Sequence, residues 1–179
     1  SEIIAKALQG HGFEVTRSDT LDSFNQLDAL LELDLIVPHW TAGKMTNDQT
    51  RNLCQAVEQG VGLAGCHGGM GDAFRDNTNY QFMVGGQWVA HPGDQHRYTV
   101  HIVDHADPIT ADVGHFSITS EQYYMHVDPS NHVLATTTFD CNGCTMPVVW
   151  KRMWGKGRVF YSSLGHCAKE FHEVPELLT

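Results

Sequence analysis

Hydrophobic residues recur along this chain with two periods, one typical of helices and one typical of strands. A helical period opens the chain, where the apolar positions are Ile3, Ile4, Ala7 and Leu8. The clearest helix is predicted over 46–59, because Thr46 is a suitable N-cap and Gln49 completes a capping box three residues later. Gly60 ends this helix, and residues 20–31 predict shorter helical pieces.

Short apolar runs between these helices predict strands. They span 13–16, 33–37, 61–64, 97–103 and 133–139. Segments 147–151 and 158–162 predict a hairpin around two glycines. Because helix and strand signals alternate, we expect an α/β fold with a mostly parallel sheet covered by helices. The segment 71–92 shows few signals apart from 82–84, and we expect a long loop there that carries function.

The order of the elements is unusual at the N-terminus. A doubly wound sheet of this kind starts with a strand, whereas this chain starts with a predicted helix. We therefore expect that the first strand is absent from this chain or that another element replaces it. No linker or repeat interrupts the 179 residues, so a single domain over 1–179 is predicted.

Composition narrows the classes of partner. A net charge of −10 argues against nucleic acid and against an anionic membrane surface, since both require clustered Lys and Arg. No apolar stretch approaches the roughly 18 to 20 residues that cross a bilayer. The five cysteines are scattered and odd in number, so a reducing, cytoplasmic location is expected. A small-molecule partner remains, and a homo-oligomer is left open.

The strongest chemical signal follows the strand predicted over 61–64. The residues there are Gly65, Cys66, His67, Gly68 and Gly69. Glycines around a polar residue between a strand and a helix permit the strained turn of a nucleophile elbow. The N-terminus of the following helix would lower the pKa of the Cys66 thiol and favour the thiolate. The alternative, an inert buried Cys66 beside a structural His67, stays open at this point.

Further histidines and a carboxylate complete the candidate site. His39 and Trp40 follow the strand over 33–37, and ligands bind at the carboxyl edge of such sheets. His166 closes the strand over 158–162. The other candidates are His91, Glu121 and Tyr123. A cysteine, a histidine and a carboxylate suit a thiol hydrolase, whereas several histidines with a carboxylate equally suit a metal site.

Five stretches of the chain form an ordered and specific set, which covers nearly its whole length. They are 60–69, 85–86, 91–92, 121–123 and 146–166. With these stretches the sequence resembles the ThuA-like family, named for trehalose utilisation, within the class I glutamine amidotransferase-like superfamily. The resemblance implies a flavodoxin-like three-layer sandwich and an N-terminal strand ahead of Ser1. It also implies a role in the catabolism of trehalose or related oxidised disaccharides.

The likeness to true glutamine amidotransferases is partial. Their elbow, Gly-x-Cys-x-Gly, matches 65–69 in part, and their catalytic histidine is followed two residues later by glutamate. Here His166 is followed by Cys167 and Ala168, so classical glutaminase chemistry is not expected. In ThuA-like sequences the elbow position need not be cysteine, whereas the histidine after it is typical. The resemblance therefore favours a site of histidines and glutamate.

The first hypothesis is a hydrolase or isomerase-type enzyme that acts on trehalose or a related keto-disaccharide. Its catalytic candidates are His67, Glu121, His166 and Cys66. Its substrate-binding candidates are His39, Trp40, Gly68, Gly69, His91 and Tyr123. The cofactor considered is a divalent metal, with candidate ligands His67, His91, Glu121 and His166.

Two alternatives remain beside this enzyme of carbohydrate catabolism. One is a hydrolase or amidotransferase-like enzyme that depends on Cys66. The other is a non-catalytic domain that binds sugars or regulates a partner. Loss of activity on alkylation of Cys66 would favour the former, and sugar binding without turnover the latter.

Overall fold

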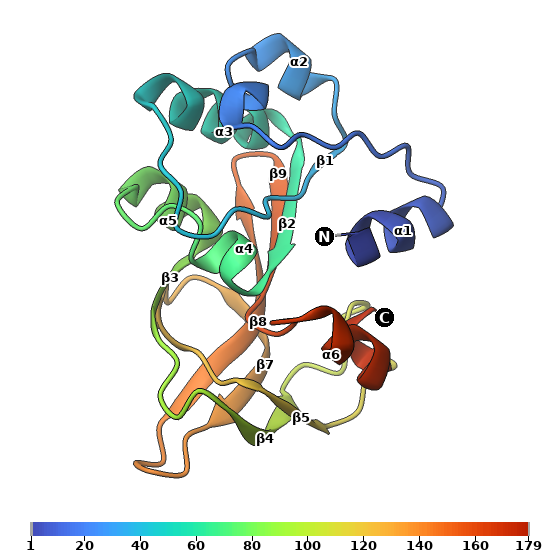
Figure 1. The fold of residues 1–179 in the computed structure, drawn as a ribbon, viewed down its shortest axis with the longest axis vertical. Coiled ribbons are helices and arrows are strands. Elements are labelled where there is room, and N and C mark those ends of the chain that lie inside the picture. The colour runs from blue at the N-terminus through green and yellow to red at the C-terminus, as the bar shows by residue number, and fades with distance from the viewer. Residues whose placement is uncertain (1, 179) are drawn as a thin grey trace.

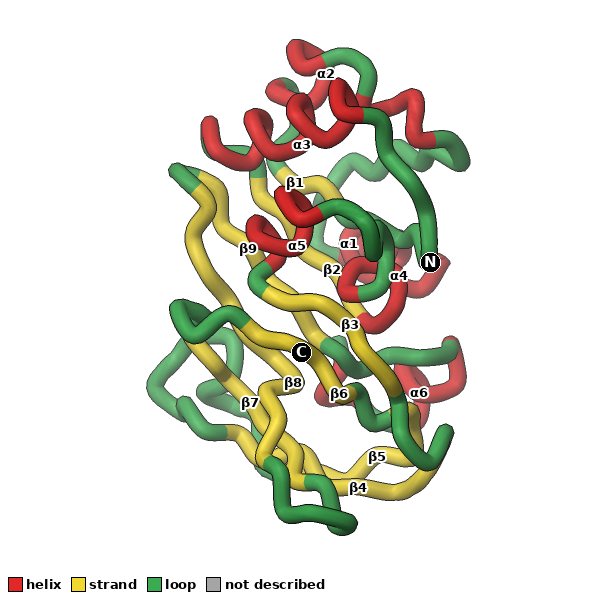
Figure 2. Tube along the Cα trace, turned by 90° about the vertical axis from the view of Figure 1, so that its left-hand side faces the viewer, coloured by secondary structure: helices red, strands yellow, loops and turns green. Residues whose placement is uncertain are grey.

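Residues 2–178 are described by the computed structural model, and they form an α/β fold around a curled, mixed sheet of seven strands (Figure 1). From one edge to the other the strands are β1 (Leu35–Ile36), β2 (Gly62–Cys66), β9 (Gly157–Ser162), β8 (Thr145–Trp154), β7 (His132–Thr138), β4 (Gln95–Ile102) and β5 (Phe116–Glu121). A separate antiparallel ladder joins β3 (Gly86–Ala90) to β6 (Tyr124–Val127). Figure 2 shows this ladder beside β8.

The large sheet changes direction at β9. The strands β1, β2 and β9 are parallel, whereas every neighbouring pair from β9 to β5 is antiparallel. The prediction of a mostly parallel sheet is therefore wrong. Along the chain, β7, β8 and β9 follow one another through connections that are too short for the crossover that parallel strands need. The predicted hairpin is confirmed as β8 and β9, which turn at Gly155 with φ +59°.

Helices gather mainly around the parallel end of the sheet. They are α1 (Glu2–Gly10), the 3-10 helix η1 (Leu21–Phe24), α2 (Leu27–Leu31), α3 (Asn47–Gln59), α4 (His67–Gly71), α5 (Thr78–Val84), α6 (Ala168–Glu173) and the 3-10 helix η2 (Pro175–Leu177). In Figure 1, α2, α3, α4 and α5 lie around β1, β2 and β9, and α6 lies near β4 and β5. The predictions for 2–10, 20–31 and 46–59 are confirmed, including the capping box of Thr46 and Gln49.

The segment 71–92 is ordered into elements, so the long loop predicted there is wrong. It contains α5 and β3. The helix begins after Asn77, whose side chain accepts a hydrogen bond from the backbone nitrogen of Tyr80 at 3.0 Å. With only seven residues, α5 is too short for its apolar stripe to show a clear helical period.

The strand predicted over 13–16 does not form. Phe13 is 44% exposed, and in the described part of the chain this segment pairs with no strand. An apolar alternation without a neighbouring strand leaves the backbone groups to water, so it does not produce a ladder. The three-layer arrangement and the absence of a first strand stay predictions.

Two apolar cores lie along the sheet. The larger surrounds β2 and β9 and includes the fully buried Leu53, Leu63 and Trp150. The indole nitrogen of Trp150 donates to the carbonyl oxygen of Val84 at 2.9 Å, which ties α5 to β8. The smaller core lies between β4, β5 and β7. Among residues 2–178, no helix combines the length and apolar character that a membrane crossing requires.

The parallel pairing of β2 with β9 places the carboxyl ends of the two strands side by side. Cys66 at the end of β2 lies opposite Ser162 at the end of β9. Because the two strands run in the same direction, the residues that follow them leave the sheet on the side of these carboxyl ends. These residues include His67 and His166.

Gln49 should be important for stability because it ties η1 to α3. Its side chain, 6% exposed, donates to the carbonyl oxygen of Leu21 and to Asn25, and accepts from the backbone of Thr46. We expect Gln49→Ala to lower the free energy of unfolding by about 2–3 kcal/mol in urea denaturation. The exposed Gln59 near the end of the same helix provides the control, with an expected loss below about 0.5 kcal/mol for Gln59→Ala. Equal losses would contradict this role.

Candidate functional site

His67 occupies the strained position of the turn between β2 and α4. The strand ends at Cys66, and His67 begins the helix with φ +47°. A left-handed backbone at a residue with a Cβ costs about 1–2 kcal/mol, and such strain gathers at functional sites. The predicted elbow is therefore present, but the side chain at its strained position is the imidazole of His67 rather than the thiol of Cys66.

Gly68 and Gly69 follow His67 where there is little room for a side chain. A Cβ on Gly69 would lie 2.6 Å from Nδ1 of His39, and one on Gly68 would lie 3.2 Å from Oη of Tyr123. The two glycines thus let α4 approach its neighbours closely. Their predicted contact with a substrate stays a prediction.

The segment Glu121–Tyr123 brings a carboxylate and a phenol to His67. Side chains alternate between the two sides of an extended segment, so Glu121 and Tyr123 face His67 together. Gln122 points the other way and is buried, where it donates to Oγ1 of Thr137 at 2.7 Å. This buried amide anchors the segment and fixes which of its side chains reach the site.

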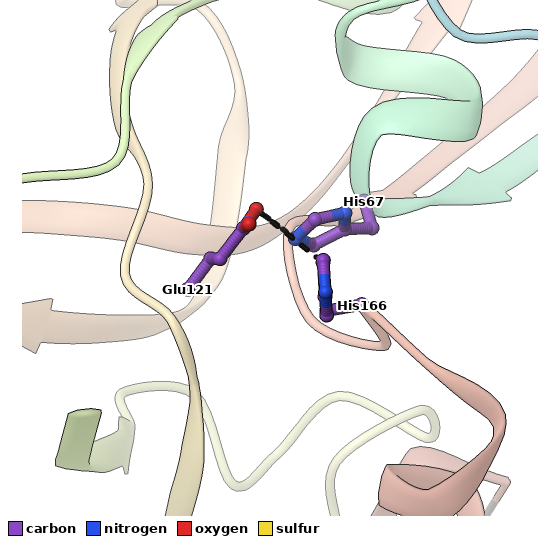
Figure 3. A group of neighbouring side chains, drawn as sticks. All are labelled: His67, Glu121 and His166. Atoms are coloured by element: carbon purple, nitrogen blue, oxygen red, sulfur yellow. Dashed lines mark ion pairs between the residues drawn. The ribbon is translucent and has the colours of Figure 1, made fainter. Parts of the chain in front are cut away.

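The three residues His67, Glu121 and His166 form what we name the histidine–glutamate cluster (Figure 3). Oε2 of Glu121 lies 3.4 Å from Nε2 of His67 and 3.4 Å from Nδ1 of His166. The side chains are 10%, 16% and 30% exposed for His67, Glu121 and His166. The cluster is thus mostly buried, and His166 is its most accessible member.

Burial sets the charge of His67. Desolvation, reinforced by the nearby His166 and His91, lowers the pKa of the imidazole to about 3, so the ring is neutral at pH 7. Nδ1 lies 2.9 Å from the hydroxyl of Tyr123, and the two rings are tilted with centroids 4.2 Å apart. Nε2 is buried and finds no hydrogen-bond partner within residues 2–178. One nitrogen is therefore fixed by the protein, and the other faces Glu121.

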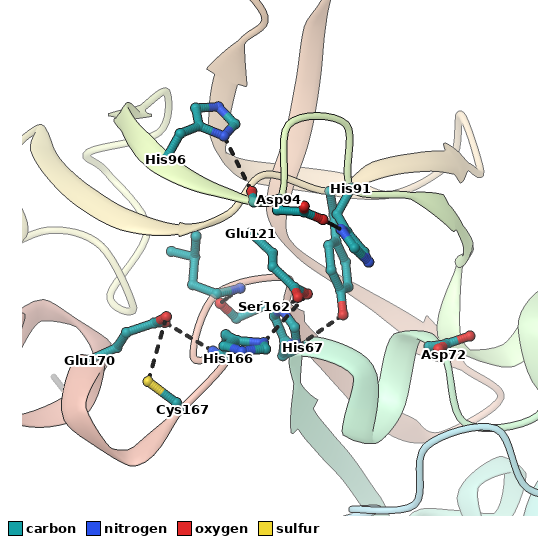
Figure 4. A network of polar contacts seen from close by, with 12 residues as sticks. His67, Asp72, His91, Asp94, His96, Glu121, Ser162, His166, Cys167 and Glu170 are labelled. Atoms are coloured by element: carbon teal, nitrogen blue, oxygen red, sulfur yellow. Dashed lines mark hydrogen bonds and ion pairs between the residues drawn. The ribbon is translucent and has the colours of Figure 1, made fainter.

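The backbone on either side of the cluster is also held. The hydroxyl of the fully buried Tyr161 donates to the carbonyl oxygen of His67 at 3.2 Å. The backbone nitrogen of His166 donates to Oε2 of Glu170 at 2.9 Å, as Figure 4 shows. Both histidines are thus positioned by hydrogen bonds to their main chain as well as by packing.

Cys66 does not have the character of a catalytic thiolate. Burial raises the pKa of the Cys66 thiol to about 11, and the carboxylate of Glu170 adds to the effect. The prediction that the N-terminus of α4 lowers this pKa is wrong, because α4 has five residues and desolvation outweighs its dipole. The thiol is protonated at pH 7.

The remaining predicted residues fall into two groups. His91 stacks on Tyr123 with centroids 6.4 Å apart and lies 5.8 Å from Trp88, so it borders the cluster without belonging to its three donors. The structure places His39 and Trp40 against α4 instead. The backbone nitrogen of Trp40 donates to the carbonyl oxygen of Gly69 at 2.9 Å.

Several residues near the site were not found from the sequence. Arg75 places its guanidinium 4.4 Å from the ring of Trp88 and pairs with the buried Asp72. Glu170 is 4% exposed and lies third in α6. An acidic residue at the third position of a helix is a known signal of its start, and it could have drawn attention to Glu170.

The cluster can act on oxygen-bearing substrates in two ways. A neutral imidazole beside a carboxylate can transfer protons. The same donors could hold a metal ion, because His67, Glu121 and His166 each offer one ligand atom and these atoms lie within 4.8 Å of one another. Of the four predicted ligands His67, His91, Glu121 and His166, the structure brings three within reach of a common ion, and His91 lies beside them.

Comparisons with known proteins establish family and fold. A sequence model of the trehalose utilisation (ThuA) family matches residues 1–178. A ThuA-like protein of Bacteroides uniformis superposes with TM-score 0.78 and 19% identity, over 99% of this chain and 80% of that chain. A ThuA-like protein of Parabacteroides merdae superposes with TM-score 0.76 and 17% identity, over 93% of this chain and 74% of that chain. A cytoplasmic protein of Salmonella typhimurium superposes with TM-score 0.72 and 14% identity, over 99% of this chain and 80% of that chain. No curated protein matches at a significant level.

The lowered pKa of His67 predicts a loss of stability in acid. The unfolded chain takes up this proton near pH 6.5, whereas the folded chain resists it until about pH 3, so acid favours unfolding across that window. In urea denaturation with a chelator present, the free energy of unfolding should fall by about 1 kcal/mol per pH unit more than in His67→Asn. Asn tolerates the left-handed backbone, which makes it the matched variant. Parallel pH profiles would rule out a neutral, buried imidazole.

The raised pKa of Cys66 predicts slow alkylation. At pH 7.5, iodoacetamide should label Cys66 at least about tenfold more slowly than the exposed Cys141, because the thiolate is the reacting form. Peptide mass spectrometry over time measures both rates in one sample. Faster labelling of Cys66 than of Cys141 would show that its thiol is activated.

Proposed function

This chain belongs to the trehalose utilisation (ThuA) family, and we propose that it is an enzyme of carbohydrate catabolism that acts on trehalose or a related keto-disaccharide. The reaction takes place at the histidine–glutamate cluster. The observation that carries the proposal is the convergence of His67, Glu121 and His166 from three separate segments at the carboxyl edge of β2 and β9.

The composition of the cluster favours the keto form of the sugar. Glycosidases commonly use two carboxyl groups about 5 to 9.5 Å apart, one on each side of the scissile bond. Here the cluster has one carboxylate, that of Glu121, between two imidazoles. Such a set suits chemistry at a carbonyl, where one group polarises the oxygen and another takes a proton from the neighbouring carbon.

Beside the cluster, Trp88 and His91 offer partly exposed rings to a sugar ring, and the buried Tyr123 lies behind them. Tyr123, His91 and Trp88 lie with their centroids 5.8 to 6.4 Å apart. The apolar face of a pyranose packs well on such rings. We assign substrate contact to His91, whose side chain is 33% exposed, whereas the buried Tyr123 positions His67 through its hydroxyl.

The site of action is proposed to be the cytoplasm. The five cysteines are odd in number and scattered along the chain, which favours a reducing compartment. A structural relative is described as a cytoplasmic protein, which agrees with this assignment.

Turnover of trehalose and of its keto derivative, followed by NMR of the sugar products, tests the proposal. We expect His166→Ala to reduce kcat/KM by about 10²- to 10⁴-fold, because His166 belongs to the reacting groups and its side chain is partly exposed. Cys66→Ala is the control and should retain activity within about threefold, since its thiol is protonated.

Two other results would overturn the proposal. Loss of turnover in Cys66→Ala with activity kept in His166→Ala would make this a thiol-dependent enzyme. Binding of the sugars, seen as a thermal shift, without turnover by any variant would make it a non-catalytic binding domain.

A further inference from the structure

Nε2 of His67 is one of the buried polar atoms around the site that lack a hydrogen-bond partner within residues 2–178, together with Nε1 of Trp88 and Nδ1 of His91. Nε2 is buried, makes no hydrogen bond within residues 2–178, and faces Glu121 and His166. A buried polar atom left without a partner loses its hydration without compensation, so this nitrogen is available to a ligand. The hydroxyl of Tyr123 already occupies the other ring nitrogen.

The spacing of the cluster matches the spacing of ligands around a metal ion. Two donor atoms that are each about 2.1 Å from an ion and meet at a tetrahedral angle lie about 3.4 Å apart. Oε2 of Glu121 is 3.4 Å from Nε2 of His67 and 3.4 Å from Nδ1 of His166. These separations are longer than good charge-assisted hydrogen bonds, which measure about 2.7–2.9 Å. Oε2 of Glu121 is thus spaced to share an ion with each histidine, and all three donor atoms lie within 4.8 Å of one another.

We propose that His67, Glu121 and His166 bind one divalent transition-metal ion through Nε2, Oε2 and Nδ1. Two imidazoles and one carboxylate suit zinc, iron(II) or manganese(II). Within 4.0 Å, the carboxylate of Glu121 is paired with the two imidazoles and with no Lys or Arg among residues 2–178, so its charge is free to balance the ion.

Neighbouring residues already hold the ligands in the required state. For Nε2 of His67 to present its lone pair, the proton must reside on Nδ1, and the hydroxyl oxygen of Tyr123 is placed 2.9 Å away to accept it. The burial that keeps His67 neutral acts in the same direction. Glu170 fixes the backbone of His166.

A second group of donors in the chain does not share these features. Asp104, Asp107 and His132 also lie within 4.8 Å of one another. There, however, Asp104 is hydrogen-bonded to His132 at 2.7 Å, and Asp107 is paired with Lys151. Because its donors already have partners, this group serves as the internal control.

Three protein ligands leave coordination positions open, which is typical of a catalytic rather than a structural metal. The partial exposure of His166 gives these positions access to solvent. Resting on the function proposed above, we assign the open positions to adjacent carbonyl and hydroxyl oxygens of a keto sugar. The ion would then polarise the carbonyl.

The test measures metal binding without any sugar. The chain is stripped with a chelator and dialysed. It is then titrated with Zn²⁺ or Mn²⁺ alone, using calorimetry for affinity and elemental mass spectrometry for stoichiometry. We expect roughly one ion per chain for the wild type. Affinity should fall at least about 100-fold in His166→Ala and about 10- to 100-fold in Tyr123→Phe, which removes the partner of His67 Nδ1. His132→Ala should bind as the wild type does.

Folding and function are controlled separately. Circular dichroism of each variant shows whether it is folded, and the partly exposed His166 is the variant expected to fold normally. Absence of binding by the folded wild type would overturn the metal site, as would binding that survives His166→Ala and is lost in His132→Ala. Sugar turnover by metal-free protein would overturn the role of the ion in polarising the carbonyl while leaving the proposed function intact. Metal binding without turnover of any disaccharide would overturn the proposed function while leaving the metal site intact.

Discussion

Backbone hydrogen bonds between β2 and β9 hold Cys66 opposite Ser162, and the histidine–glutamate cluster is positioned relative to that pair. Since the two strands are parallel, their ends lie together, and the chain that leaves each of them carries a histidine to the same place. One histidine follows immediately in a left-handed conformation, and the other follows after a short loop. An antiparallel arrangement of the same two strands would put these histidines at opposite edges of the sheet.

Burial selects which side chain of the elbow can take part in chemistry. The same desolvation lowers the pKa of His67 and raises the pKa of Cys66, because in each case it disfavours the charged form. A neutral imidazole keeps a lone pair that can accept a proton or bind an ion. A neutral thiol is a poor nucleophile. The turn thus presents a neutral imidazole, and not a thiolate, at its strained position.

Much of the fold could be predicted where a local signal decides the structure. The capping box of α3 and the glycine turn between β8 and β9 depend on neighbouring residues, and both are confirmed. Whether neighbouring strands are parallel or antiparallel depends on which distant segments pair. The alternation of helices and strands along the sequence does not contain this information, so the prediction of a mostly parallel sheet was wrong. The short helix α5 was not predicted, because its seven residues are too few to show a clear helical period.

The candidate site was predictable in its residue types more than in its geometry. His67, Glu121 and His166 could be chosen from motifs, but which elbow residue takes the left-handed backbone is one dihedral angle that flanking glycines leave undetermined. The approach of Glu170 to His166 was missed because the carboxylate was sought two residues after the histidine, whereas one turn of α6 brings it from four residues away.

The bond between Tyr123 and His67 spans 56 positions of the chain and joins the antiparallel end of the sheet to the parallel end. Contacts of such long range carry a large loop-closure entropy and form late when a protein folds. The cluster is therefore complete only after both ends have come together. During refolding, α3 and the hairpin of β8 and β9, whose contacts are local, would return first. The cluster also needs the pairing of β2 with β9, in which Leu63 and Val159 are 96 positions apart, so it would form later.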